Sequence, residues 1–273
     1  MNRRQFLKTT LGLVAGAAGL AAYPTLLEPN WIRLERLTFP VPGLPADLDG
    51  YTIGVLADLH MGPLVPVGRV RRAAAMLAAQ KPDLVMVAGD MTGHVEMEEA
   101  HRMVDDGLAP VKGAYGVLGN WDYFHYDGRL KFYGIKPQST VRMLVNEGVE
   151  VAPGLWLGGL NEGIFLDADV DKALAGAPRG AVKLLLAHEP DLADLVRPDH
   201  GVALQISGHT HGGQVRLPVA GPLILPPMGQ KYVAGLCKAP ACHVYVSRGL
   251  GTTQVPVRLF CPPEITLIQL KRG

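Results

Sequence analysis

The chain is poor in cysteine, and this shortage excludes two kinds of construction. Three of its 273 residues are cysteines, Cys237, Cys242 and Cys261. So few, in an odd number, exclude a disulfide-built scaffold and a Cys-x-x-Cys metal site. Two states stay open at this point: Cys237 could pair with Cys242 in an exported protein, or all three could be buried thiols.

Excess charge is also lacking, since the formal net charge is +1. Proteins that bind nucleic acid usually carry a basic stripe, so no nucleic-acid partner is expected. What the chain does contain is apolar material, at 48% of residues. A balanced charge with this hydrophobicity excludes a disordered chain and predicts a substantial core. The length is acceptable for one α/β enzyme.

The first residues differ from the rest of the sequence. Arg3, Arg4 and Lys8 form a basic start, and an apolar stretch runs from Leu11 to about Leu27. This order is the pattern of an export signal, and the Arg-Arg-x-Phe-Leu-Lys string resembles the twin-arginine type. We therefore expect residues 1–27 to engage the twin-arginine export machinery. The protein would then lie in the periplasm or at the outer face of the cytoplasmic membrane, anchored there if the leader is not cleaved.

After this leader, a Pro-rich segment, residues 28–50, leads into one catalytic domain over residues 51–270. Short apolar runs there alternate with amphipathic stretches, which predicts an α/β fold. The expected strands are 51–57, 84–88, 113–118, 155–160, 182–187, 203–207, 243–247 and 264–270. The expected helices are 67–80, 96–109, 136–148 and 189–198.

Metal-capable residues follow the ends of five expected strands. They are Asp58 and His60, Asp90, Asn120, His188, and His209 with His211. Ligand sites in open α/β sheets lie at the carboxyl ends of strands, so these side chains are predicted to converge. Carboxylate, amide and imidazole groups without a thiolate suit Mn, Fe or Zn. The sequence therefore predicts a metal site.

The same ordered set resembles the calcineurin-like metallophosphoesterases over about residues 51–270. The matching strings are Asp58-x-His60, Gly89-Asp90, Gly119-Asn120-x-Asp122, Ala187-His188-Glu189-Pro190-Asp191 and Gly208-His209-x-His211. They look most like its exported, twin-arginine branch, some members of which act on UDP-2,3-diacylglucosamine, a lipid A precursor. The resemblance implies a four-layer α-β-β-α sandwich of two mixed sheets flanked by helices.

The resemblance also implies a division of the ligands between two divalent metal ions. Asp58, His60 and His211 would hold the first ion, and Asn120, His188 and His209 the second, with Asp90 as the bridge. Two such ions bring more positive charge than Asp58 and Asp90 neutralise, so the centre would attract a phosphate anion. We expect in-line attack by a metal-bound hydroxide without a covalent enzyme intermediate.

The expected substrate is a phosphate-containing small molecule or lipid, with a phosphoester or pyrophosphate bond to be cut. UDP-2,3-diacylglucosamine is one example. Two alternatives stay open: a broad phosphodiesterase or phosphomonoesterase, and a catalytically silent metal-binding scaffold.

One position departs from the family pattern, because Trp121 stands where many relatives have a histidine that serves as general acid. Indole cannot deliver a proton at neutral pH. This favours a good leaving group, as in a pyrophosphate, over a simple alkyl ester. His125 could replace the missing acid or be a loop histidine, so Asp90, Asn120, Asp122 and His125 form the predicted catalytic set. His94 and Arg248 are candidate substrate contacts, with loop and structural roles as their alternatives.

Overall fold

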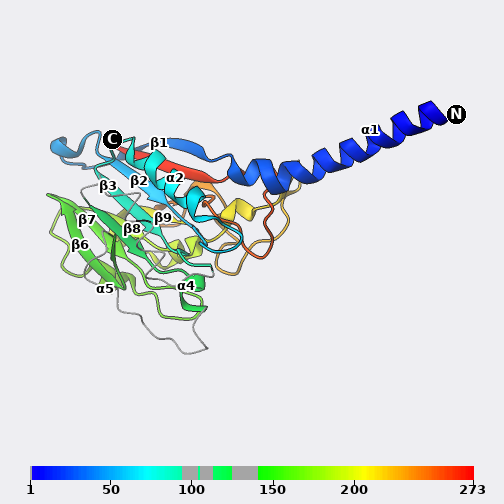
Figure 1. Ribbon diagram of the computed structural model, residues 1–273. Coiled ribbons are helices and arrows are strands. Elements are labelled where there is room, and N and C mark those ends of the chain that lie inside the picture. The colour runs from blue at the N-terminus through cyan, green and yellow to red at the C-terminus, as the bar shows by residue number, and fades with distance from the viewer. Residues whose placement is uncertain (1, 94–103, 105–112, 125–140) are drawn as a thin grey trace.

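The computed structural model describes residues 2–93, 104, 113–124 and 141–273. Two six-stranded sheets lie face to face in it (Figure 1). The first has the order β1 (Arg33–Val41), β14 (Glu264–Arg272), β2 (Thr52–Leu56), β3 (Leu84–Ala88), β4 (Ala114–Val117) and β5 (Val141–Met143). The second has the order β12 (Gly235–Lys238), β13 (His243–Val246), β9 (Val202–Ser207), β8 (Val182–Leu186), β7 (Leu155–Gly159) and β6 (Glu147–Ala152).

Both sheets are mixed, with parallel strands at their centres. Strands β2 to β5 pair in parallel in the first sheet, and β7, β8, β9 and β13 do so in the second. Antiparallel pairs are β14 with β2, β6 with β7, and β12 with β13. Strands β3 and β7 are buried along their whole length, which explains why they read as continuous apolar runs. The carboxyl ends of the parallel strands define the edge at which the candidate site forms.

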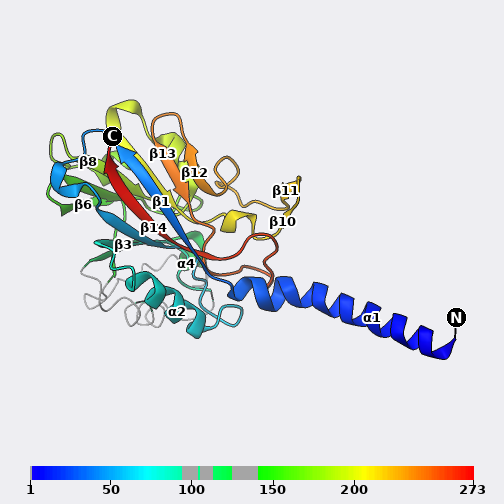
Figure 2. The ribbon, with the colours of Figure 1, turned by 90° about the horizontal axis from the view of Figure 1, so that it is seen from above.

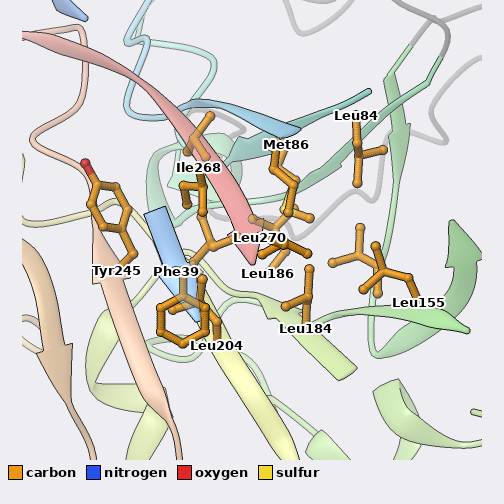
Figure 3. Packing of buried hydrophobic residues seen from close by; sticks show 14 of the residues in the cluster. Phe39, Leu84, Met86, Leu155, Leu184, Leu186, Leu204, Tyr245, Ile268 and Leu270 are labelled. Carbon is orange, nitrogen blue, oxygen red and sulfur yellow. The ribbon is translucent and has the colours of Figure 1, made fainter. Parts of the chain in front are cut away.

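Three apolar clusters separate the layers. One lies between the sheets and combines residues of both, including Met86, Leu184 and Ile268 (Figure 3). A second packs the first sheet against helix α2 (Val67–Ala78), and a third packs the second sheet against the short helix α5 (Val170–Leu174) and the 3₁₀ turn Pro190–Leu195. The predicted α-β-β-α sandwich of two mixed sheets is confirmed, with a thin helical layer on the second sheet.

Two expected helices are wrong and one cannot be compared. Within 136–148, the described part forms strand β5 and the start of β6 instead of a helix. The alternating Val-Arg-Met sequence suits a strand, and Asn146, at φ +50°, interrupts the backbone between the two strands. The stretch 189–198 forms 3₁₀ turns that begin at Pro190 and Pro198. The helix expected at 96–109 lies almost wholly outside the described residues.

The Pro-rich segment 28–50 contributes a strand that the sequence pattern did not predict. Strand β1 pairs in parallel with β14 along nine residues at the edge of the first sheet. Its side chains Phe39 and Val41 enter the inter-sheet core. The segment is therefore tied into the sandwich by backbone hydrogen bonds and by apolar packing.

Helix α1 (Arg3–Ala22) projects away from the sandwich (Figures 1 and 2). Its apolar side chains Phe6, Leu7, Leu11 and Leu13 are exposed. Among the described residues, no helix combines the length and the hydrophobicity needed to cross a membrane.

Ile268 at the centre of β14 offers a test of the inter-sheet packing. Its side chain is 0% exposed, so Ile268→Ala removes buried methylene groups and leaves a cavity. We expect the free energy of unfolding to fall by about 2–5 kcal/mol, measured by urea denaturation. Val255→Ala, at a position 49% exposed, is the control and should change it by less than about 0.5 kcal/mol.

Candidate metal centre

The predicted metal-binding residues follow the carboxyl ends of β2, β3, β4, β8 and β9, with Asn120 as the first residue of helix α4 (Asn120–Phe124) and His211 as the first residue of a 3₁₀ turn. Backbone hydrogen bonds hold these segments together: Asp58 N donates to Gly89 O at 3.1 Å, His60 N to Asp90 O at 2.9 Å, and Gly208 N to His188 O at 3.1 Å. The site is thus assembled by main-chain contacts that continue the sheets beyond their last residues.

The backbone is strained at five of the seven predicted ligands. Asp58, His60, Asp90, His209 and His211 have φ values of +50°, +43°, +51°, +74° and +52°. Residues with a Cβ rarely adopt this left-handed region, and such strain gathers at functional sites. The left-handed backbone turns these five side chains toward one another, and their ligand atoms converge.

Asp58, His60 and His211 form one group of converging ligand atoms, all buried. The Nε2 atoms of His60 and His211 are 3.0 Å apart. Asp58 Oδ1 lies 3.9 Å from His211 Nε2 and also accepts a hydrogen bond from His209 N at 2.7 Å. This is the group predicted for the first ion.

His188 and His209 form the second group, with His188 Nε2 3.2 Å from His209 Nδ1. The other nitrogen of each ring contacts a backbone carbonyl: His188 Nδ1 lies 2.7 Å from Ala88 O, and His209 Nε2 lies 2.7 Å from Pro227 O. A carbonyl only accepts, so these nitrogens carry the protons. The facing nitrogens can therefore act as ligands, with the ring orientation fixed by the outer contact.

Asp90 lies between the two groups. Its Oδ2 is 3.3 Å from His60 Nε2 and 3.1 Å from His188 Nε2, while its Oδ1 accepts a hydrogen bond from Trp121 N at 2.8 Å. One oxygen thus faces a ligand of each group. This position is the one that a bridging carboxylate requires.

Two buried oxygen atoms test whether these residues fit metal ions. Asp58 Oδ2 and Asn120 Oδ1 have no hydrogen-bond partner among the described residues, and buried acceptors are normally satisfied. The facing imidazole nitrogens are 3.0 Å apart in the first group and 3.2 Å apart in the second. Cations held by the two groups would engage these nitrogens and Asp58 Oδ2, so the residues fit two ions.

The pKa values follow from burial and from the charge of Asp90. Burial lowers the pKa of His209 to about 4, helped by nearby His188, and burial with the proximity of His60 holds that of His211 well below its ordinary value. Burial alone would lower the pKa of His188, but the nearby Asp90 carboxylate raises this pKa well above the ordinary value of histidine. Burial raises the pKa of Asp58 to about 7. His209 and His211 are therefore neutral near pH 7, as ligand imidazoles must be.

Asp122, predicted as catalytic, contacts backbone rather than the ligand cluster. Its carboxylate accepts from Gly119 N at 2.9 Å and from Thr92 N at 3.0 Å. It therefore ties the loop that follows β3 to the loop that follows β4, the two loops that carry Asp90 and Asn120. Burial raises its pKa to about 7. Asp122 therefore positions the segments that carry Asp90 and Asn120 and is not itself a candidate ligand.

Glu189 was missed by the sequence reasoning as a candidate ligand. It is fully buried beside His188 and can share a cation with His188 and His209. One carboxylate oxygen accepts from Gly163 N at 3.1 Å, and the other has no hydrogen-bond partner among the described residues. Its place directly after His188 was the available signal.

The remaining predicted residues have different outcomes. Trp121 lies edge-on to His60, with ring centroids 5.4 Å apart, so the residue replacing the family histidine does border the cluster. The Arg248 guanidinium forms ion pairs with Glu35 and Glu264, which matches the structural alternative. His94 and His125 lie outside the described residues. The three cysteines are free thiols in the structure.

Glycine makes room for the Asp58 carboxylate. Gly249 has φ +66°, and a Cβ there would lie 2.4 Å from Asp58 Oδ2. We expect Gly249→Ala to displace this ligand and to lower metal affinity by about 10- to 100-fold, the scale for a disturbed ligand environment, measured by competition with a chelator. Gly201→Ala is the matched control because Gly201 has φ +63° with nothing within 4 Å of its Cβ. Equal affinities in the two variants would contradict the placement of Asp58.

Comparison with known proteins gives the class to which this fold and site belong. The family model described as calcineurin-like phosphoesterase matches residues 51–213, more than half of the chain. The chain therefore belongs to the calcineurin-like phosphoesterases and is a metal-dependent phosphoesterase.

Similar proteins span nearly the whole chain. The uncharacterized metallophosphoesterase YkuE of Bacillus subtilis is 32% identical over 99% of this chain and 98% of its own length. The phosphodiesterase YaeI of Escherichia coli is 33% identical over 99% of both chains. Among solved structures, a dimetal phosphatase from Danio rerio aligns with 76% of this chain and 90% of its own at 13% identity and a TM-score of 0.44.

Proposed function

We propose that this phosphoesterase uses two divalent ions, Mn, Fe or Zn, to cut a phosphodiester or pyrophosphate bond in a lipid-linked or nucleotide-sugar substrate such as UDP-2,3-diacylglucosamine. The observation that carries the proposal is Trp121 beside His60 at the candidate centre. Because the indole supplies no proton, the leaving group must depart as a stable anion. A nucleoside monophosphate leaving from a pyrophosphate meets this condition.

The division of the ligands follows the family resemblance and, for the Asp and His residues, the groups described above. Asp58, His60 and His211 would hold one ion, and Asn120, His188 and His209 the other, with Asp90 shared. Bound there, two ions would lower the pKa of a water molecule and offset the charge of the phosphate. Asp122 keeps the loops of Asp90 and Asn120 in register.

Export is part of the proposal, supported by the arginine pair and the apolar stretch behind it. The enzyme would then work at the outer face of the cytoplasmic membrane or in the periplasm. Replacing both Arg3 and Arg4 by lysine should leave the protein in the cytoplasm, measured by cell fractionation. Unchanged export of that variant would contradict the twin-arginine route.

A substrate screen tests the choice of bond. The metal-loaded protein would be offered UDP-2,3-diacylglucosamine, cyclic nucleotides and glycerophosphodiesters with Mn, Fe or Zn. We expect the pyrophosphate substrate to give the highest kcat/KM. Similar kcat/KM values for all of these substrates would favour the alternative of a broad-specificity phosphodiesterase. Two bound ions with no turnover of any substrate would favour the silent scaffold.

A further inference from the structure

Exposed apolar side chains gather where helix α1 leaves the sandwich. They come from three segments far apart in the sequence: residues 23–31, the hairpin formed by β10 (Arg216–Leu217) and β11 (Gly221–Pro222), and the loop 252–260. We define the apolar platform by Trp31, Val219, Leu223, Ile224, Val255 and Phe260. Their exposed fractions range from 49% for Val255 to 110% for Val219. Figure 2 shows the loop before β14 reaching the base of α1, and the hairpin on the far side of that loop.

Hydrogen bonds fix these segments to one another. Gln214 Nε2 donates to Thr253 O at 3.1 Å, and Arg216 N donates to Leu259 O at 2.9 Å, which links hairpin and loop. Arg258 N donates to Pro24 O at 2.8 Å, and the buried Glu28 carboxylate accepts from Phe260 N at 3.0 Å. These hydrogen bonds fix the backbone of the three segments, so the exposed apolar side chains of the platform sit on an ordered surface.

The platform segments carry few acidic residues, and this charge distribution favours an anionic partner. Residues 23–33, 214–224 and 252–260 contain one acidic residue, Glu28, and Glu28 is 0% exposed. The cationic residues include Arg33, whose guanidinium lies 3.9 Å from the centroid of the Trp31 ring. Tryptophan with a neighbouring arginine is characteristic of the zone between headgroups and acyl chains. An apolar surface whose own segments expose no carboxylate fits an anionic lipid bilayer.

We propose that the apolar platform docks on an anionic bilayer, with the hairpin tip inserted between lipid headgroups. The exposed apolar side chains and the Arg33 guanidinium lie together in the platform segments. This is the combination by which interfacial segments bind anionic membranes.

The platform also adjoins the candidate metal centre. The hairpin follows His211 by a few residues, and Cys261, at the end of the loop, places its Sγ 3.2 Å from His211 O. This step rests on the proposed function: docking of the platform would bring the metal centre close to the lipid headgroups. The phosphate of a lipid-linked substrate could then reach the centre while its acyl chains stay in the bilayer.

Vesicle binding by the full chain tests the platform. The variant Val219→Glu with Ile224→Glu places charge at two positions exposed by 110% and 80%, so folding should be unaffected. We expect it to bind phosphatidylglycerol vesicles at least about tenfold more weakly than the unmodified chain, in a sedimentation assay. The control, Leu195→Glu with Phe165→Glu, changes two exposed residues (48% and 52%) outside the platform and should stay within about twofold.

Three results would overturn the proposal: no binding of the unmodified chain, equal binding of the two double variants, or a dimer in vesicle-free buffer that only the platform variant converts to a monomer. Turnover of bis-p-nitrophenyl phosphate, a soluble substrate, should be unchanged in both variants. Turnover by an unmodified chain that shows no platform-dependent vesicle binding contradicts the docking surface alone. Platform-dependent binding without any turnover contradicts the proposed function alone.

Discussion

Asp90→Asn should lower kcat/KM on bis-p-nitrophenyl phosphate by more than about 100-fold, the scale on which one charged contact to a reacting centre acts. Asp90 Oδ2 lies within 3.3 Å of ring nitrogens from both ligand groups. The amide keeps the shape but removes the negative charge that these groups share. We therefore expect the variant to bind less metal as well, measured by inductively coupled plasma mass spectrometry.

Asp122→Asn is the matched comparison for this experiment. Asp122 is also a buried aspartate of the site, but it accepts hydrogen bonds from backbone N–H groups. Burial raises its pKa to about 7, and an amide keeps an oxygen acceptor for one of the two backbone N–H groups. Because these hydrogen bonds go to backbone rather than to the ligand groups, Asp122→Asn should cost less than Asp90→Asn, within about tenfold. If Asp90→Asn retains more than a tenth of the unmodified turnover, Asp90 is not the bridge.

Trp121→His should raise turnover of alkyl phosphodiesters by about tenfold or more. General acid catalysis typically contributes about 10²–10⁴-fold, and a newly placed histidine is expected to recover part of it. The backbone N–H of this residue donates to Asp90, and histidine preserves that bond. Aryl esters, whose leaving group needs no proton, should gain little.

The ratio of alkyl to aryl turnover is the measurement, and Trp121→Phe is its control. Phenylalanine removes the indole without supplying a proton donor, so it should leave the ratio near that of the unmodified enzyme. A histidine variant with an unchanged substrate profile would show that leaving-group protonation does not depend on this position. The preference for a pyrophosphate would then lose its support.

The convergence of the Asp and His candidate ligands was predictable from the sequence because these residues follow strand ends. Buried parallel strands read as apolar runs, and the polar residue that ends each run, such as Asp58 or His188, falls at one edge of the sheet. Glu189 escaped notice because a glutamate beside a proline also fits a solvated turn. Burial alone, at 0% exposure, distinguishes the two.

The regions that sequence reasoning missed depend on tertiary pairing. Strand β1 has two inward-facing residues of strong apolar character, and its pairing with β14 joins segments more than two hundred residues apart. A helix was predicted over 136–148, but in the described part β5 pairs with β4, and β6, which begins at Glu147, pairs with β7. Arg248 follows a strand as a phosphate ligand would, yet Glu35 from that unpredicted β1 holds its guanidinium. The pattern of apolar and polar residues within one segment does not predict contacts between segments that are far apart in the sequence.

Metal stoichiometry measured together with turnover tests the account most directly. The full chain would be loaded with Mn, Fe or Zn, freed of excess ions, and assayed on bis-p-nitrophenyl phosphate. We expect two ions per chain and a turnover that a chelator removes and the metal restores. Two bound ions without turnover, or full turnover in the chelated protein, would contradict it.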